Sequence, residues 1–342
     1  MIISASRRTD IPAFYSEWLV NRLKEGFALV RNPRNYHQLS RIALTPEQVE
    51  GIVLWTKNPA PMLDRLPALK DYVYYFQFTL TPYGRDVEPG LPDKDRVMIP
   101  VFQELSRRIG RERVVWRYDP IFFGRTHTPQ WHLQRFHEMA ARLSGYTEEC
   151  VISFLDYYRN TQKQMEGLGL VELASEERTV FLRKLAQAAA GYGLRLKACA
   201  EDPSFRALGI LPSSCVDAAR LERIRGSRES AGSSREDIGG GRAGIGSHQE
   251  CMNGSRAGIS GDLERAGRRP VPAGRDRNQR PLCGCAASVD IGVYNTCAHG
   301  CRYCYANYNP AAVRGNRERY SPEEPLLCGR VEKGDVVRER RQ

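Results

Sequence analysis

The sequence lacks any run of about 18 apolar residues, which argues against a transmembrane helix. Its first residues, MIISASRRTDIPAF, lack the basic start and long apolar stretch of a secretory signal, so we expect a cytoplasmic protein without a membrane partner. Glycine-rich loops of the dinucleotide or P-loop type are also missing, which argues against those nucleotide-binding classes. Cysteine, by contrast, is plentiful: the chain has ten, five of them between Cys283 and Cys304. In a reducing compartment this crowding favours metal or cluster ligation over disulfides.

The chain is basic, with a formal net charge of +11 at pH 7. Nucleic-acid binding requires clustered lysines and arginines, because the partner is a dense line of phosphates. Here the arginines are spread along the sequence and are concentrated partly in a segment of low complexity. Charge alone therefore leaves a nucleic-acid partner open without selecting it.

Short apolar runs recur at regular intervals and have the composition of β-strands, as in IISAS, GIVLWTKNP, YVYYFQFTLTP, VVWRYDPIF, CVISFLDYY and LRLKACAED. Between most of them lie stretches with helical periodicity, at residues 14–24, 97–109, 131–143 and 175–190. This alternation predicts an α/β fold with a parallel sheet, and about seven strands suggest a (β/α) barrel, complete or partial. FALVRNP and LSRIALTP are close enough in sequence to form a hairpin.

Composition divides the chain into three parts. Residues 1–224 carry the barrel pattern, and residues 276–342 form a cysteine-rich segment that we expect to bind an iron–sulfur cluster and to complete the barrel. Between them, more than half of residues 225–275 are Gly, Arg or Ser, and none is aromatic. Such a segment buries too little apolar surface to offset its ordering entropy, so we expect disorder. Out-of-frame translation of a GC-rich gene would explain the same composition.

Polar residues follow several of the predicted strands. In a (β/α) barrel the active site lies at the carboxyl ends of the strands, so these residues are candidates for catalysis. Arg7 and Asp10 follow the first strand, and Arg117 and Asp119 end VVWRYDP. Arginine suits a carboxylate or phosphate through its two-pronged guanidinium. Solvated loops and a structural ion pair are the alternative explanations.

Three cysteines near the end of the chain, Cys297, Cys301 and Cys304, have the spacing C-x3-C-x2-C. A structural zinc site needs four ligands, whereas three thiolates around a four-iron cluster leave one iron open to another ligand. The trio therefore favours an open iron–sulfur cluster, with a structural zinc or iron site as the alternative. His299 lies inside this loop and could be a fourth ligand, but its position favours a surface histidine.

With Tyr303 before the last cysteine, the motif becomes C-x3-C-x-aromatic-C, which resembles the signature of radical S-adenosylmethionine enzymes. The resemblance implies a 4Fe–4S cluster that binds S-adenosylmethionine and generates a 5′-deoxyadenosyl radical. It also implies that Tyr303 and Tyr305 pack near the adenine, and that a ferredoxin or flavodoxin type of protein supplies electrons. The substrate is not implied.

Longer stretches, including MIISASRRTDIPAF, IVLWTKNPAPML, CAED and CGCAASVDIGVYNTCAHGCRYCYANY, resemble an uncharacterised bacterial family, domain of unknown function number eighteen forty-eight. That family is regarded as similar to the radical enzymes. Typical radical enzymes carry the cysteine loop after the first barrel strand, but here it comes last. A circular permutation would reconcile the two orders by placing DIGVYNT beside IISAS.

A second set of cysteines, Cys199, Cys215, Cys283 and Cys285, provides enough thiolates for a closed auxiliary iron–sulfur cluster or a zinc site. Alternatively, Cys199 is a small buried apolar residue and Cys215 an incidental loop thiol. The competing function for the whole chain is a noncatalytic zinc or iron–sulfur protein that binds nucleic acid.

Overall fold

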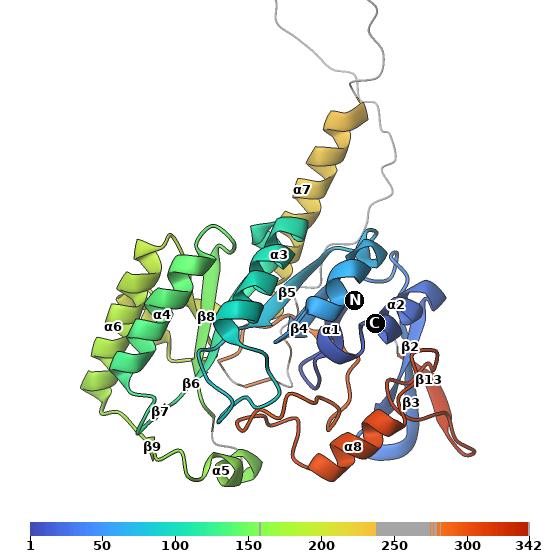
Figure 1. The fold of residues 1–342 in the computed structure, drawn as a ribbon. Coiled ribbons are helices and arrows are strands. Elements are labelled where there is room, and N and C mark those ends of the chain that lie inside the picture. The colour runs from blue at the N-terminus through green and yellow to red at the C-terminus, as the bar shows by residue number, and fades with distance from the viewer. Residues whose placement is uncertain (157–158, 237–273, 275, 277–278, 281, 341–342) are drawn as a thin grey trace, which may run out of the picture.

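The computed structural model describes residues 1–156, 159–236, 274, 276, 279–280 and 282–340. Its centre is an eight-stranded sheet in the order β11-β10-β8-β6-β5-β4-β1-β12, in which all neighbouring strands run parallel (Figure 1). The strands are β1 Ile2–Ala5, β4 Gly51–Thr56, β5 Tyr74–Thr79, β6 Val114–Ile121, β8 Glu149–Phe154, β10 Arg195–Cys199, β11 Leu211–Ser213 and β12 Ser288–Asp290. The predicted α/β fold with a parallel sheet is confirmed. No ladder joins β11 to β12 in the described part of the chain, so a closed barrel is not observed.

Helices connect most of these strands. They are α1 Ile11–Phe14, α2 Ser16–Glu25, η1 Ala60–Leu69, η2 Lys94–Met98, α3 Ile99–Ile109, η3 Arg111–Arg113, α4 Pro129–Leu143, α5 Arg159–Met165, α6 Ser175–Gly191, η4 Pro203–Leu208, α7 Ala218–Glu236 and α8 Pro310–Glu318. The four predicted helical stretches correspond to α2, α3, α4 and α6. Their ends follow known capping rules: α4 begins at Pro129, and the Thr128 hydroxyl accepts a hydrogen bond from the Trp131 amide. None of the helices in these described ranges has both the length and the apolar character needed to span a membrane.

Two small sheets flank the main one. The predicted hairpin is confirmed as β2 Phe27–Asn32 and β3 Asn35–Ala43, which pair antiparallel, and β13 Val336–Glu339 adds a parallel strand to β3. The second is formed by β7 Phe123–Gly124 and β9 Leu170–Val171. In Figure 1 the β2–β3–β13 sheet lies beside the main sheet, close to the N-terminus.

Alternation along the strands gives the main sheet two different faces. One face, with Ile3, Phe76 and Trp116, belongs to the large core that also contains the buried sides of α2, α3, α4 and α6. The other face, with residues such as Ile2 and Val115, packs against the first turns of α7 through Leu221 and Ile224 and contains four cysteines. We call this second face the inner face.

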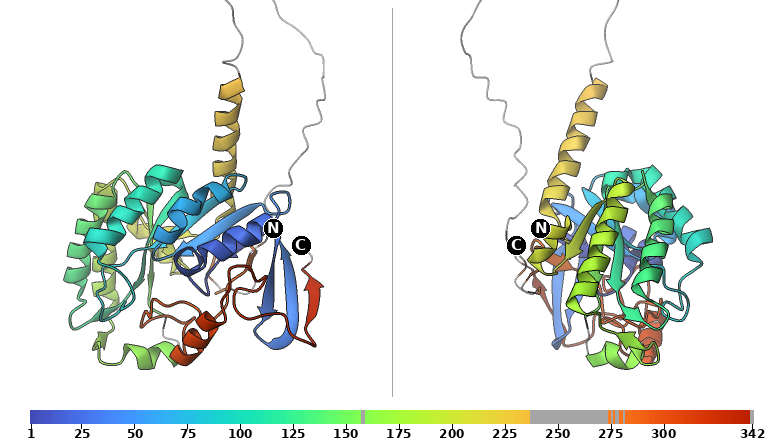
Figure 2. Two further views of the ribbon diagram at one scale, coloured as in Figure 1. Left: turned by 45° about the vertical axis from the view of Figure 1, so that its right-hand side comes forward. Right: turned by 90° about the vertical axis from the view of Figure 1, so that its left-hand side faces the viewer.

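The first turns of α7 sit close to the sheet because Gly51 has no side chain. A Cβ atom at this position would lie 2.6 Å from the Leu221 methyl groups. Arg225 donates to the Glu50 carbonyl at 2.7 Å, which fixes the helix to the strand end. Arg228, one turn further on, still donates to the Tyr72 carbonyl, and the far end of α7 projects away from the body of the protein (Figure 2).

Helix α7 continues through residues 225–236 and thus enters the segment for which we expected disorder. Its first turns are held by burial on the inner face, which the composition of the segment does not reveal. Residues 237–273 and 275, the greater part of the segment, lie outside the described residues.

The expected place of the segment before the cysteine loop, beside the first strand, is confirmed. Strand β12 pairs with β1, with Ile2 opposite Ser288 and Ser4 opposite Asp290, so IGVYNT continues from a strand beside IISAS. The two edges of the sheet also approach each other through their loops: the Ala286 amide donates to the Val216 carbonyl at 3.0 Å.

Candidate functional site

A cleft of about 1240 Å³ opens at the carboxyl ends of the parallel strands. The structure brings every residue of the predicted site into its lining: Arg7, Asp10, Arg117, Asp119, Cys199, Cys215, Cys283, Cys285, Cys297, Cys301, Tyr303, Cys304 and Tyr305. Inner-face side chains change from apolar to polar along each strand, as Val115, Arg117 and Asp119 do on β6. The inner face of the sheet is therefore polar at the carboxyl ends of the strands, where it lines the cleft. At the other ends of the strands it is part of the packed core.

The cysteine loop lies between β12 and α8, and Asn295 closes its base. The Asn295 backbone is left-handed, with φ of +54°, and its amide donates to the Ala306 carbonyl at 2.9 Å. Its side-chain oxygen accepts from the amides of Tyr308 and Asn309 at 2.9 and 3.2 Å. Asparagine tolerates the left-handed conformation better than most residues, so one side chain both makes the turn and closes the loop.

The outside of the cysteine loop packs against the segment that follows β5. The Gly90 amide donates to the His299 carbonyl at 2.9 Å, and the Arg302 amide donates to the Val87 carbonyl at 2.9 Å. A Cβ atom at Gly90 would lie 2.6 Å from the His299 carbonyl oxygen, so only glycine fits this approach. These contacts fix the loop against the segment that follows β5.

His299 is buried, with 3% of its surface exposed, so the expectation of a surface histidine is wrong. Its Nε2 lies 2.8 Å from Oδ2 of Asp10, and its ring packs on Phe14 with a centroid separation of 4.6 Å. Asp10 also accepts hydrogen bonds from the amides of Ala13 and Lys57, at 3.0 and 2.7 Å. These contacts suit a positioning role for Asp10, and its predicted catalytic role stays a prediction.

Burial controls the protonation of the three loop thiols. It raises the pKa of Cys297 well above its usual range and that of Cys301 to about 12. It also raises the pKa of Cys304, although hydrogen bonds from the amides of Ala306 and Asn307 act in the opposite direction. Amide donors of this kind stabilise a thiolate when a metal binds it.

Glu88 forms a buried ionic centre beside the loop, and the sequence analysis missed it. Its carboxylate accepts hydrogen bonds from Lys57 at 2.7 Å and Thr81 at 2.8 Å, and also from Lys94 and the Tyr303 hydroxyl. Burial disfavours the charge, but the two ammonium groups outweigh it and lower the pKa of Glu88 to about 2. Because Glu88 binds both the Tyr303 hydroxyl and Lys57, the Lys57 ammonium nitrogen lies over the Tyr303 ring, 5.2 Å from the ring centroid.

Glu88 lies in an irregular segment, PYGRDVEPG, which has neither strand nor helix periodicity, and for this reason no sequence pattern pointed to it.

Asp290, at the end of β12, is a second missed residue. It accepts hydrogen bonds from the hydroxyls of Ser4 and Ser6 at 3.0 and 2.6 Å and from the Arg7 amide at 2.8 Å. The Gly292 amide adds a further bond at 2.9 Å. The strand pattern in SVDIGV was a usable signal, because the polar residue that ends a parallel strand lies at the site edge.

Arg117 and Asp119 form a partly buried ion pair at the end of β6. The Ser153 hydroxyl donates to the other Asp119 oxygen, and Arg117 donates to the Cys215 sulfur at 2.9 Å. Burial tends to lower the pKa of Arg117, but Cys215 and Asp119 raise it well above its usual value. Arg117 is therefore a fixed positive charge in the wall of the cleft.

Arg7 faces the same cleft from the end of β1. Its guanidinium lies 5.4 Å from the centroid of the Trp55 ring and 3.5 Å from a carboxylate oxygen of Asp276. In the described part of the chain, its buried Nη2 atom has no hydrogen-bond partner. The carbonyl of Arg7 accepts from the Tyr305 hydroxyl at 3.0 Å, so Tyr305 is tied to the cleft wall although its ring is exposed.

The second set of cysteines also comes together, on the inner face below the loop. Cys199 and Cys215 have their sulfur atoms 3.0 Å apart. The Cys285 sulfur accepts hydrogen bonds from the backbone amides of Cys215 and Val216 at 3.2 and 3.4 Å, and Cys283 lies in the same buried cluster. Within the described ranges, no three or more His, Cys, Asp and Glu side chains are already arranged to hold a metal ion.

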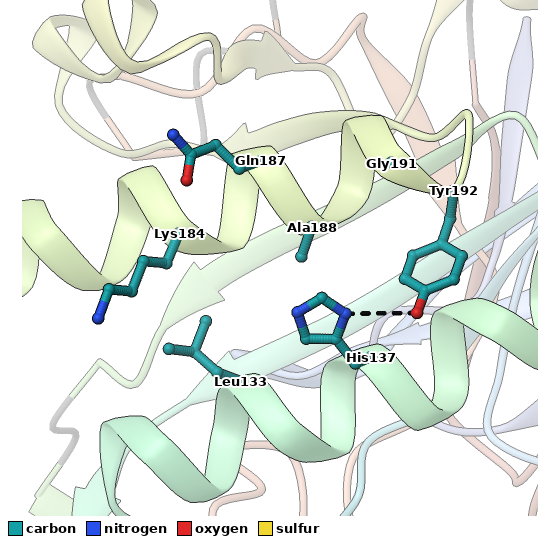
Figure 3. A pocket seen from close by; sticks show the side chains of 7 residues that line it. All are labelled: Leu133, His137, Lys184, Gln187, Ala188, Gly191 and Tyr192. Carbon is teal, nitrogen blue, oxygen red and sulfur yellow. Dashed lines mark hydrogen bonds between the residues drawn. The ribbon is translucent and has the colours of Figure 1, made fainter.

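A second hollow, of about 570 Å³, lies between α4 and α6 on the outside of the sheet. Figure 3 shows His137 and Tyr192 facing each other across it, with Nδ1 3.3 Å from the hydroxyl, and Lys184 turned outward. It contains none of the predicted site residues, and its lining lacks the convergent charged groups of the large cleft.

Comparison with known proteins identifies the family of the chain. The family model described as Domain of unknown function (DUF1848) matches residues 2–306, from the first strand into the cysteine loop beyond Cys304. The chain belongs to this family, as its sequence stretches led us to expect. A search of curated proteins gave no match.

Proposed function

We propose that this member of the family is a radical S-adenosylmethionine enzyme whose 4Fe–4S cluster is held by Cys297, Cys301 and Cys304. The observation that carries the proposal is the position of the three thiols. They project from one loop into a polar cleft at the carboxyl ends of a parallel sheet, where α/β enzymes bind their ligands. A purely structural metal site has no need of such a cleft.

The residues present fit an open cluster. The loop supplies three thiols, and the buried imidazole of His299 is turned toward Asp10 through Nε2. Amide groups already point at Cys304, and Lys57 lies near Cys301, where a cation favours a thiolate. When bound, such a cluster supplies one open iron for S-adenosylmethionine and the electron that releases its 5′-deoxyadenosyl radical.

The cleft residues then have distinct roles. Arg7 offers its Nη2 donor, which has no hydrogen-bond partner among the described residues and suits the carboxylate of S-adenosylmethionine or of a substrate. Tyr303 and Tyr305 flank Cys304, and their hydroxyls are tied to Glu88 and the Arg7 carbonyl, so both rings are held as walls for an adenine. Their bulk would also help to exclude water from a radical.

Arg117 and Asp119 are bound to each other and to neighbours, so we assign them to binding and positioning within the site.

We also propose how the sheet is related to a (β/α) barrel. The open parallel sheet acts as a partial (β/α) barrel in which β12 takes the first place, although it is the last of the eight strands in sequence order. The protein would work in the reducing cytoplasm with a ferredoxin or flavodoxin type of reductant.

The test is anaerobic reconstitution with iron and sulfide, followed by chemical reduction, addition of S-adenosylmethionine and quantitation of 5′-deoxyadenosine. The wild-type chain should form the nucleoside, and Cys301→Ala should lose at least about tenfold of it. Cys328→Ala is the matched control, because Cys328 is outside the lining of the cleft and should leave the yield unchanged. An iron-loaded wild type that forms no nucleoside would contradict the enzyme and favour the noncatalytic metal protein.

A further inference from the structure

Four cysteines that the proposed cluster does not use gather on the inner face of the sheet. Cys199 ends β10, Cys215 follows β11, and Cys283 and Cys285 precede β12. All four are buried, and they belong to one packed cluster with Val53, Val115 and Val151 among others. Chance placement of four thiols from three separate segments in one contact group is improbable in a chain with ten cysteines.

The contacts within this group begin with Cys199 and Cys215, whose sulfur atoms are 3.0 Å apart. Cys283 and Cys285 lie in the same buried cluster and line the same cleft. The backbone amides of Cys215 and Val216 donate to the Cys285 sulfur at 3.2 and 3.4 Å. Amide groups that point at a sulfur atom are typical of metal-bound cysteines.

Positive charge lies next to the sulfur atoms. Arg117 donates to the Cys215 sulfur at 2.9 Å, and the guanidinium of Arg7 is a charge neighbour of Cys285 and Cys215. Four thiolates around a divalent ion carry a net charge of roughly −2, which is costly to bury alone. The guanidinium groups of Arg117 and Arg7, each of which also contacts a carboxylate, reduce that cost.

The site also lies where the open sheet needs support. The loops that follow β11 and precede β12 are joined by the Ala286 amide, which donates to the Val216 carbonyl at 3.0 Å. The Ser214 hydroxyl adds a bond to the Gly284 carbonyl at 2.8 Å. These few bonds connect the two edges of the sheet without a strand ladder.

We propose that Cys199, Cys215, Cys283 and Cys285 bind one zinc ion in tetrahedral coordination, and that this ion joins the two edges of the sheet. Four protein ligands close the coordination sphere, so the ion is structural and takes no part in catalysis. The proposal is independent of the three-cysteine cluster and of the proposed reaction.

Sulfur spacing favours a single ion. Zinc–sulfur bonds of about 2.3 Å in a tetrahedron place the sulfur atoms about 3.8 Å apart. The Cys199 and Cys215 sulfurs, at 3.0 Å, reach that spacing by separating about 0.8 Å, which side-chain rotation provides. A four-iron cube holds its cysteine sulfurs much farther apart and would have to displace the packed residues around this group.

The experiment uses the full chain with Cys297→Ala, Cys301→Ala and Cys304→Ala combined, so that the loop site is removed. Elemental analysis of this background variant should find about one zinc per chain. Adding Cys283→Ser and Cys285→Ser should reduce zinc below about 0.2 per chain, whereas Cys328→Ser in the same background should retain it.

A second measurement does not depend on the folding of the serine variants. The zinc-free background variant is titrated with Co²⁺, and we expect the visible absorption of a tetrahedral thiolate site to saturate near one equivalent. Failure to bind either metal would overturn the proposal. So would iron and sulfide bound in this background, or a Cys199–Cys215 disulfide found in the anaerobically purified protein by mass spectrometry.

Discussion

The Nε2 atom of His299 lies 2.8 Å from Oδ2 of Asp10, a contact between residues 289 positions apart in the sequence. Asp10 also caps α1 through the Ala13 amide and accepts from the Lys57 amide. One buried carboxylate therefore connects the cysteine loop, the end of the first strand and the segment after β4. The position of the loop depends on this connection as well as on the pairing of β12 with β1.

His299→Ala should loosen the cysteine loop. It removes a buried hydrogen bond to a carboxylate and leaves a cavity beside Phe14, so we expect a loss of about 2 to 3 kcal/mol in the free energy of unfolding. The variant should also retain less iron than the wild type after anaerobic reconstitution. Urea denaturation and iron analysis measure the two effects. His37→Ala is the control because that side chain is exposed, and equal behaviour of the two variants would contradict a positioning role for His299.

Gly90→Ala tests the other side of the loop. The new Cβ would lie 2.6 Å from the His299 carbonyl oxygen and 2.8 Å from that of Ala298, so the loop has to move. We expect a destabilisation of about 1 to 3 kcal/mol and lower iron retention. Gly191→Ala is the control. A Cβ atom added at Gly191, at the end of α6, would have no neighbouring atom within 4 Å, so this substitution should leave the free energy of unfolding unchanged or raise it slightly. Matching denaturation curves for the two variants would show that the close approach at Gly90 is unimportant.

Glu88→Gln should destabilise the fold by about 3 kcal/mol near neutral pH, because it leaves the ammonium groups of Lys57 and Lys94 buried without their counter-charge. The pKa of Glu88 is lowered in the folded protein to about 2 from the usual 4.5. The ionised carboxylate therefore stabilises the wild type fully above pH 4.5, and this contribution is lost as the pH falls toward 2.

Denaturation of wild type and Glu88→Gln at several pH values measures this difference. The gap between the two proteins should be constant from pH 7 down to about pH 5 and should narrow below it. Glu104→Gln provides a comparison, since its arginine partners are exposed and solvent screens the pair, so its loss should cost much less than that of Glu88. A gap that does not change with pH would rule out the carboxylate charge as its cause.

The sequence predicted the parallel sheet because each buried strand is a short apolar run separated by a periodic helix. It also predicted the neighbourhood of β1 and β12, because the cysteine loop needed a barrel strand before it. The cleft residues followed from the rule that polar residues after parallel strands meet at one edge.

Other features depend on contacts that no local pattern records. Glu88 stands in an irregular segment, and its role arises only when Lys57 and Lys94 converge on it. His299 appeared to be a loop residue because its partner, Asp10, is nearly a full chain length away. The start of α7 has low apolar content, yet Leu221 and Ile224 pack against the inner face and Arg225 bonds to the Glu50 carbonyl.

Asp290→Asn tests the connection between the cysteine-rich segment and the first strand. Both carboxylate oxygens accept hydrogen bonds, from two serine hydroxyls and from the amides of Arg7 and Gly292. In asparagine one of these oxygens is replaced by an NH2 group, which is itself a donor and cannot accept these bonds. We expect a loss of about 2 to 3 kcal/mol. Asp64→Asn is the control, since its side chain is 90% exposed.

Hydrogen exchange locates the damage caused by Asp290→Asn. If Asp290 holds β12 on β1, amides in residues 288–304 should exchange at least about tenfold faster in the variant, while those in β6 change less. The reason is that β12 is an edge strand of three residues, and its ladder partner among the described residues is β1. Faster exchange spread evenly over both regions would instead indicate a general loss of stability, and the cysteine loop would then be held chiefly by His299 and Gly90.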